Sequence, residues 1–196
     1  MSKLAQKIDI LHKTGKTVFS TNELAIYWNM ENKDVLYVNI ARMKEGGFLK
    51  SVQRGLYCIN GVDVDEMELA GSLKKNSYVS FETVLAKEGV IHQWHGAYFS
   101  ASDRKLELKN NYGKFIYRRL PENILNNRLG INNTGHYFVA NKERAICDYF
   151  YKVNFQQLDD LDDIDIDKII EISKIYSNKR LEDDICKLTK LVHEIR

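Results

Sequence analysis

Apolar residues recur at helical spacing in three short runs within the first 45 residues. The runs consist of Leu4, Ile8 and Leu11, then Leu24, Tyr27 and Trp28, then Leu36, Ile40 and Met43. A spacing of three or four residues places each run on one face of an α-helix. Thr21 and Asn32 precede the second and third runs, and their side chains can accept hydrogen bonds from a first helical turn. Gly46 and Gly47 end the third helix, because glycine adopts the left-handed conformation at little cost.

The pattern after these glycines is that of a β-hairpin. Residues 48–52 and 56–59 have strand character, and Gln53-Arg54-Gly55 forms a short turn between them. Three helices followed by a hairpin is the order of a winged helix-turn-helix, which we predict for residues 1–60. The alternative is a small α+β domain with no role in DNA binding. The acidic segment 61–71 is predicted to be a short helical connector.

Residues 72–196 mix helical and strand patterns and are predicted to form a second domain of mixed α/β structure. Ser80 is expected to cap a helix that carries Val84 and Leu85 and ends near Gly89. Strands are expected at 97–102, 105–108, 114–119 and 137–140, and helices at 143–151 and twice in the C-terminal tail. The fold class predicted for the chain is therefore α+β, with an N-terminal winged helix-turn-helix followed by this mixed domain.

Composition and charge narrow the class of protein. Hydrophobic residues make up 44% and charged residues 29% of the chain, the balance of an ordinary folded domain. No apolar run approaches the ~20 residues that cross a bilayer, so we expect a cytoplasmic protein with no membrane partner.

Residues 1–60 hold nine Lys and Arg against five Asp and Glu, whereas residues 121–196 hold 11 Lys and Arg against 14 Asp and Glu. This asymmetry indicates that the N-terminal end faces a polyanion. The acidic run 159–167 is either a solvated segment or a mimic of nucleic acid.

The third predicted helix has the properties of a DNA recognition helix. With its apolar run buried, Asp34, Val38 and Arg42 point outward. Arg42 can bind guanine through two hydrogen bonds, and an arginine beside a glycine at the hairpin tip suits a phosphate or the minor groove. The predicted DNA-contact residues are Lys33, Asp34, Tyr37, Val38, Arg42, Lys44, Lys50, Gln53 and Arg54. Lys16 is a further candidate for a phosphate contact, and the alternative for all these charges is that they are simply solvated.

Signals for catalysis are weak. His92 and His95 can share a helix face, but a zinc site needs further ligands, and none lies at a matching spacing. Asp103, Glu107 and Lys109 imitate the carboxylate–carboxylate–lysine pattern of a nuclease, although the two carboxylates are close in sequence for convergence on one metal ion. We therefore predict no catalytic residue, no metal and no cofactor. The alternative function is a metal-dependent nuclease with an attached DNA-binding domain.

Several segments, in their order along the chain, resemble the AbiEi family of antitoxins. They are Gly47-Phe48-Leu49 with Arg54-Gly55-Leu56-Tyr57, Ser77-Tyr78-Val79-Ser80-Phe81-Glu82-Thr83-Val84-Leu85 with Gly89-Val90-Ile91, Tyr112-Gly113-Lys114-Phe115-Ile116-Tyr117, and Ala140-Asn141-Lys142-Glu143-Arg144-Ala145-Ile146-Cys147-Asp148. The first resembles the family's wing, and the second the helix that opens its C-terminal domain. The chain departs from the family at residues 142–145, where Pro-Glu-Lys-Ala is common.

The resemblance implies an antitoxin of a type IV toxin–antitoxin system that acts in abortive infection as a phage defence. It implies that the N-terminal domain represses its own promoter by binding inverted repeats in double-stranded DNA. It also implies that residues 72–196 counteract a nucleotidyltransferase toxin without forming a stable complex with it. We expect the working face of this C-terminal antitoxin domain between Lys74-Lys75 and Arg118-Arg119; the alternative is that these are scattered solvated charges.

Overall fold

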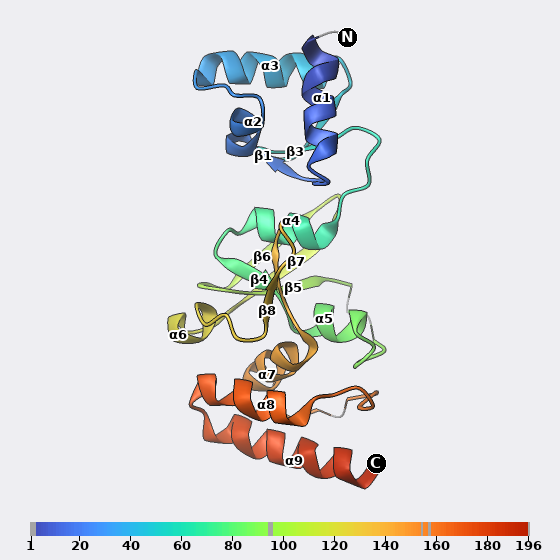
Figure 1. Cartoon of the computed structure of the whole chain (residues 1–196), viewed down its shortest axis with the longest axis vertical. Coiled ribbons are helices and arrows are strands. Elements are labelled where there is room, and N and C mark those ends of the chain that lie inside the picture. The colour runs from blue at the N-terminus through green and yellow to red at the C-terminus, as the bar shows by residue number, and fades with distance from the viewer. Residues whose placement is uncertain (1–2, 94–95, 154, 157, 196) are drawn as a thin grey trace. The chain divides into compact units, whose positions relative to one another are not determined.

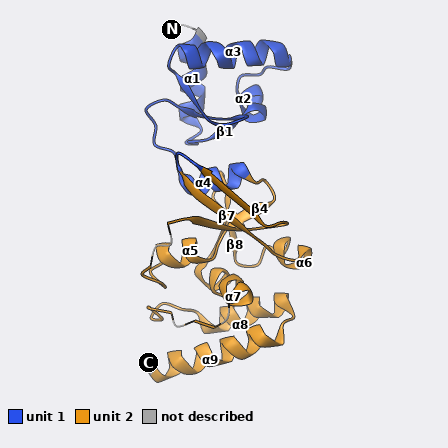
Figure 2. Cartoon of the chain, turned by 180° about the vertical axis from the view of Figure 1, so that it is seen from behind, with its two compact units in different colours: residues 1–73, 110–112 blue, residues 74–109, 113–196 orange. Residues whose placement is uncertain are grey.

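The computed structural model describes residues 3–93, 96–153, 155–156 and 158–195 (Figure 1). The chain is a mixed α+β protein, which confirms the predicted fold class at that level. It divides into two compact units (Figure 2): unit 1 is Met1–Leu73 with Asn110–Tyr112, and unit 2 is the rest. Within the described ranges, no helix has both the length and the apolar character to cross a membrane.

Unit 1 combines helices with a small antiparallel sheet. Its elements are α1 (Lys3–Lys13), β1 (Phe19–Ser20), α2 (Thr21–Tyr27), α3 (Lys33–Glu45), β2 (Leu49–Gln53), β3 (Leu56–Ile59) and α4 (Glu66–Leu73). The strand order is β1-β3-β2, with Phe19 opposite Tyr57 and Leu49 opposite Ile59. The three helices and the hairpin thus form where the apolar spacing predicts them.

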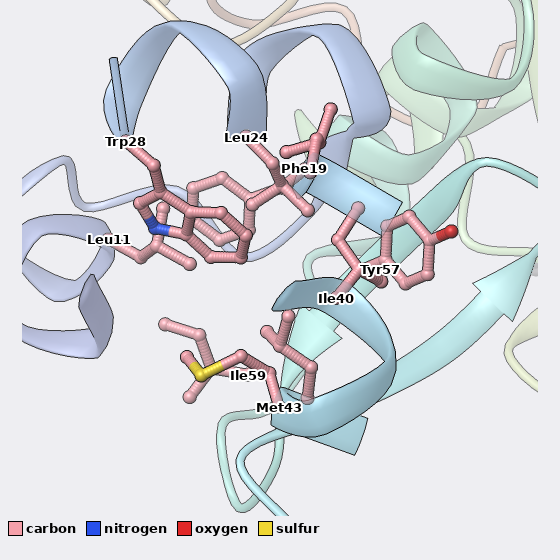
Figure 3. Packing of buried hydrophobic residues seen from close by; sticks show 10 residues of the cluster. Leu11, Phe19, Leu24, Trp28, Ile40, Met43, Tyr57 and Ile59 are labelled. Carbon is pink, nitrogen blue, oxygen red and sulfur yellow. The ribbon is translucent and has the colours of Figure 1, made fainter. Parts of the chain in front are cut away.

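The apolar faces of α1, α2 and α3 meet in one core over this sheet (Figure 3). The buried side chains are Leu11, Phe19, Leu24, Trp28, Leu36, Ile40, Met43, Leu49, Tyr57 and Ile59. The indole N–H of Trp28 donates to the main-chain oxygen of Lys7 at 3.3 Å, which satisfies its one polar group. Burying a leucine or methionine side chain stabilises a fold by roughly 1.5–3 kcal/mol, so this cluster sets the rotation of each helix about its axis.

Helix α2 begins with a capping box one residue earlier than predicted. Ser20 Oγ accepts from the backbone N–H of Glu23 at 3.3 Å, and the Glu23 carboxylate accepts from the backbone N–H of Ser20 at 2.8 Å. The prediction of Thr21 as the cap is wrong. Both the N–H and the hydroxyl of Thr21 donate to the main-chain oxygen of Gly55, at 3.0 and 3.3 Å. Thr21 therefore attaches the turn of the hairpin to α2.

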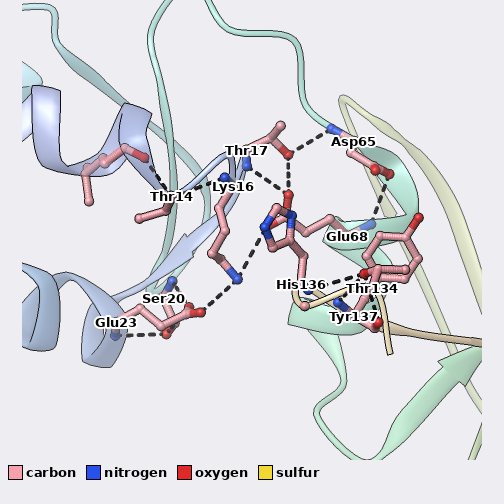
Figure 4. A network of polar contacts seen from close by, with 12 residues as sticks. Thr14, Lys16, Thr17, Ser20, Glu23, Asp65, Glu68, Thr134, His136 and Tyr137 are labelled. Atoms are coloured by element: carbon pink, nitrogen blue, oxygen red, sulfur yellow. Dashed lines mark hydrogen bonds and ion pairs between the residues drawn. The ribbon is translucent and has the colours of Figure 1, made fainter. Parts of the chain in front are cut away.

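Lys16 lies inside unit 1 between two carboxylates (Figure 4). Its Nζ is 2.9 Å from Glu23 Oε1 and 3.3 Å from Glu68 Oε1, and its side chain is only 8% exposed. The prediction that Lys16 contacts a phosphate is therefore wrong, because its charge is neutralised inside the unit. Burial alone would raise the pKa of Glu23, but hydrogen bonds from Lys16 and Ser20 outweigh it and hold that pKa below its usual range.

Exchange of Glu23 for glutamine should cost unit 1 stability at neutral pH and much less in acid. A carboxyl whose pKa is lowered on folding stabilises the fold above its unfolded pKa of about 4.3, and this stabilisation is lost as the pH falls through the folded pKa. We expect Glu23→Gln to lower the free energy of unfolding by about 1 kcal/mol near neutral pH. Urea unfolding between neutral and acid pH measures the difference, with the exposed Glu31→Gln as the control. A loss that stays constant with pH would refute this assignment.

Unit 2 is built on a mixed sheet. Its elements are β4 (Ser77–Val79), α5 (Glu82–Lys87), β5 (Tyr98–Ser102), β6 (Leu106–Asn110), β7 (Gly113–Arg119), α6 (Glu122–Leu125), β8 (Ile131–Asn133), β9 (Phe138–Ala140), α7 (Lys142–Lys152), α8 (Ile166–Ser173), the 3₁₀ helix η1 (Lys174–Tyr176) and α9 (Lys179–Ile195). The six-stranded order is β6-β7-β5-β4-β9-β8. β4 pairs antiparallel with β5 and parallel with β9, and β5 pairs parallel with β7. The sequence pattern predicts β5, β6, β7 and β9 but neither β4 nor β8.

Asp148 on α7 is fully buried and collects three hydroxyl donors. It accepts from Ser80 Oγ at 2.7 Å, from the Tyr78 hydroxyl at 3.0 Å and from the Tyr176 hydroxyl at 2.6 Å. Ser80 therefore does not cap α5, contrary to the prediction. Burial raises the pKa of Asp148, and the neighbouring Arg144 and the three hydroxyls oppose that rise. These bonds join β4, α7 and η1.

Arg144, one helical turn before Asp148, is also fully buried, and its Nε lies 3.4 Å from Asp148 Oδ1. Its guanidinium donates to the main-chain oxygens of Ile124 at 2.8 Å and Leu129 at 3.0 Å. It also donates to the Tyr78 hydroxyl at 3.1 Å. Removing one partner of such a buried pair leaves an uncompensated charge and typically costs 3–5 kcal/mol. This pair therefore anchors the loop after α6 to α7.

Gly130 is where that loop approaches α7 most closely. Its φ is +76°, and a Cβ added there would lie 2.8 Å from Arg144 Cβ, 3.0 Å from Asn141 Oδ1 and 3.0 Å from Ile172 Cδ1. The Gly130 carbonyl accepts from the Asn141 N–H at 2.8 Å. The nearest of these atoms, Arg144 Cβ, is attached directly to the backbone of α7 and cannot move aside as the tip of a flexible side chain could.

Replacement of Gly130 by alanine should therefore cost more stability than replacement of Gly135. Both glycines have positive φ, but a Cβ at Gly135 meets no atom within 4 Å. In each variant the left-handed backbone lowers the free energy of unfolding by roughly 1–2 kcal/mol. Overpacking lowers it by about 1–3 kcal/mol more in Gly130→Ala alone. Denaturant unfolding followed by circular dichroism separates the two. Equal losses would contradict the close packing described for Gly130.

Candidate nucleic-acid interface

Helix α3 presents one face to the core of unit 1 and the other to solvent. Asn32 caps its first turn as predicted, because its Oδ1 accepts from the N–H groups of Asp34 at 2.9 Å and Val35 at 3.2 Å. The buried face consists of Leu36, Ile40 and Met43. The predicted orientation of the helix is thus confirmed.

Each α3 residue that we predicted to contact DNA is exposed. These residues are Lys33, Asp34, Tyr37, Val38, Arg42 and Lys44. Tyr37 is 55% exposed and Val38 49%. Val35, which the prediction missed, is also 49% exposed. Its spacing from Val38 and Arg42 was the signal that could have identified it. The solvent face of α3 therefore carries exposed valines together with basic and acidic side chains.

The β2–β3 hairpin carries the remaining predicted residues. Lys50 on β2 and Gln53 and Arg54 at the turn are all exposed. The turn needs Gly55, whose φ is +77°, and the Gly55 carbonyl is held by Thr21 at the start of α2. The pairing of β2 with β3 shifts register between Ser51 and Gln53, a bulge that increases local twist. The tip with Arg54 is therefore fixed relative to α2.

The turn between α2 and α3 follows Tyr27, the last residue of α2. Asn29 adopts the left-handed conformation with φ +50°, which asparagine tolerates better than most residues. The N–H of Met30 donates to the Ala25 carbonyl at 2.8 Å, and that of Asn29 to the Ile26 carbonyl at 3.1 Å. These bonds close the end of α2 in the way typical of a left-handed helix terminus.

Two of the four basic residues predicted as the working face of unit 2 form ion pairs inside the unit. Lys74 Nζ is 2.7 Å from Asp103 Oδ1, and the Lys74 side chain is 12% exposed. Arg118 binds Glu82 through two hydrogen bonds of 2.7 and 2.6 Å. Both charges are thus neutralised within unit 2.

Arg118 and Arg119 are consecutive in β7, so their side chains point to opposite faces of the sheet. The Arg118 guanidinium lies 4.9 and 4.5 Å from the ring centres of Phe81 and Phe99. Arg119 and Lys75 are exposed. Of the four predicted residues, Lys75 and Arg119 are therefore the two that offer a well-exposed charge to a ligand.

The two carboxylates of the nuclease-like pattern are engaged in separate ion pairs. Asp103 pairs with Lys74, whereas Glu107 Oε1 lies 2.8 Å from Lys114 Nζ on β7. Lys109 is exposed on β6. No group of three or more His, Cys, Asp and Glu in the described part of the chain can hold a metal ion.

Of the two histidines considered as metal ligands, the structure describes His92. His92 is exposed, and its backbone N–H donates to Asp159 Oδ2 at 2.6 Å. His95 lies outside the described residues. Asp159, the first residue of the acidic run, thus accepts a hydrogen bond from the backbone of His92, 67 residues earlier in the chain.

The sequence matches no protein-family model, and no curated protein is significantly similar to it. The candidate interface is therefore judged by its own geometry and chemistry. Its two parts are the solvent face of α3 and the tip of the β2–β3 hairpin, both fixed by contacts within unit 1.

Proposed function

We propose that the chain is an antitoxin and autorepressor that binds inverted repeats in its own promoter through unit 1. In this proposal α2, the turn and α3 form a helix-turn-helix, and the β2–β3 hairpin is its wing. The observation that carries the proposal is that α3 buries Leu36, Ile40 and Met43 and exposes each of its own residues that we expect to contact DNA. An α-helix about 10–12 Å across fits a major groove about 12 Å wide.

The distribution of unpaired basic groups supports a nucleic-acid partner for unit 1. Five of its basic side chains form no ion pair with the described residues: Lys33, Arg42, Lys44, Lys50 and Arg54. All five lie on α3 or the hairpin, whereas Lys16 is neutralised by Glu23 and Glu68. Phosphate neutralisation by such groups supplies affinity, and contacts to base edges supply specificity.

Unit 2 is the proposed antitoxin part. It packs separately from unit 1, and Lys74, Arg118 and Arg144 are neutralised inside it. Within unit 2, the segment 121–196 carries an excess of acidic residues, so this segment is a poor partner for nucleic acid. By the resemblance, it counteracts a nucleotidyltransferase toxin without a stable complex, and Lys75 and Arg119 are its candidate exposed contacts. The cytoplasm is the compartment that this function requires.

Arg42→Ala should weaken binding to the promoter and relax specificity at one base pair. Loss of a bidentate contact to guanine costs about 1–3 kcal/mol. Fluorescence anisotropy with the full-length protein and labelled promoter DNA at fixed salt measures the effect. Lys13→Ala is the matched control, because Lys13 pairs with Asp9 on α1 at 2.7 Å. Lys44→Ala should instead weaken all sequences alike and reduce the salt slope by about one. An Arg42→Ala protein with unchanged affinity and specificity would rule out α3 as the recognition helix.

The two functions should separate in full-length variants. Arg42→Ala combined with Arg54→Ala should abolish repression of a promoter reporter and leave rescue from the toxin intact, because both residues belong to unit 1. Lys75→Glu combined with Arg119→Glu should do the reverse, because both are exposed on unit 2. Protein levels measured by immunoblot control for stability. Loss of rescue in the unit 1 variant at normal protein level would refute the division of labour.

A further inference from the structure

Three side chains form a row along the solvent face of α3. Val35, Val38 and Arg42 are spaced three and four residues apart, which places them on one stripe of the helix. Val35 and Val38 are each about half exposed, so they are not part of the core. Valine has a nearly fixed χ1 in a helix, so these methyl groups occupy defined positions on the surface.

The stripe combines two apolar side chains with one cation. Arg42 lies one helical turn after Val38, and Asp34 and Glu45 border the stripe at three or four residues from Val38 and Arg42. Lys33 and Lys44 lie nearer the buried face of α3, and Lys50 and Arg54 are exposed on the hairpin. The basic groups of α3 and the hairpin outnumber the two acidic ones. Exposed valines next to an arginine suit a polyanion that displays isolated apolar groups.

We propose that Val35 and Val38 contact the C5-methyl groups of thymines beside the guanine bound by Arg42. This inference rests on the proposed DNA-binding function and names the sequence feature that it recognises. The thymine methyl is the one apolar group on the major-groove edges of the base pairs. Val38 and Arg42 are separated by about 6 Å along the helix axis, roughly two steps of about 3.4 Å along DNA. The half-site therefore contains thymine within a few base pairs of that guanine.

Uracil substitution tests the contact one methyl group at a time. Uracil keeps the hydrogen-bonding groups of thymine and lacks its C5-methyl. Each thymine of the promoter fragment is replaced singly, and binding of the full-length protein is measured by anisotropy. We expect uracil to raise the Kd about 3- to 10-fold at one or two positions in each half-site. Thymines outside the half-sites are the internal control.

Protein variants complete the test. Val38→Ser or Val35→Ser should bind the thymine fragment more weakly and should no longer distinguish uracil from thymine at the matching position. Ile170→Ala, which truncates an exposed side chain on α8 of unit 2, should behave like the wild type.

Other outcomes overturn the inference in distinguishable ways. Specific binding that tolerates uracil at every position would overturn it and leave DNA binding by unit 1 standing. If uracil has no effect and the serine variants change the mass of the free protein in light scattering, the stripe binds a second copy and the inference is wrong. Absence of sequence-specific binding by the wild type would overturn the proposed function itself.

Discussion

The burial of Leu36, Ile40 and Met43 in the core of unit 1 determines what α3 can do. These three side chains fix the rotation of the helix, and each contributes roughly 1.5–3 kcal/mol by burial. Turning α3 by one residue position, about 100°, would bring polar groups into the core and expose apolar ones. The total stability of a domain is only about 5–15 kcal/mol, so the helix has one available orientation. The outward position of Val38 and Arg42 follows from it.

Ion pairs inside the two units decide which basic residues are available to a ligand. Lys16, Lys74, Arg118 and Arg144 are each matched by a carboxylate, and Arg144 is completely buried. Such pairs position elements more than they add stability, because desolvation of the charges opposes their attraction. Within unit 1, the basic side chains Lys33, Arg42, Lys44, Lys50 and Arg54 form no ion pair with the described residues, and all five lie on α3 or the hairpin. A count of charges along the sequence cannot make this distinction, since it gives the buried and the exposed residues equal weight.

Much of unit 1 is predictable because its signals are local. The run Leu36, Ile40 and Met43, with Asn32 before it, specifies α3, its cap and its buried face. The failures come from contacts between distant residues. Ser80 looks like a helix cap, yet its hydroxyl is taken by Asp148, 68 residues later. Likewise, Arg144 and Asp148, spaced as in an ordinary surface pair, are buried because β4, η1 and the loop after α6 surround α7. The sequence of the helix alone does not distinguish a buried Arg–Asp pair from an exposed one.

The central claim is that α3 of the intact protein occupies the major groove of promoter DNA. Protection of guanine N7 from methylation by dimethyl sulfate tests it most directly, because N7 lies on the major-groove edge. We expect the bound wild-type protein to protect guanines at symmetric positions in the two repeats. Bound protein that leaves every guanine N7 in the repeats reactive would contradict a major-groove position for α3.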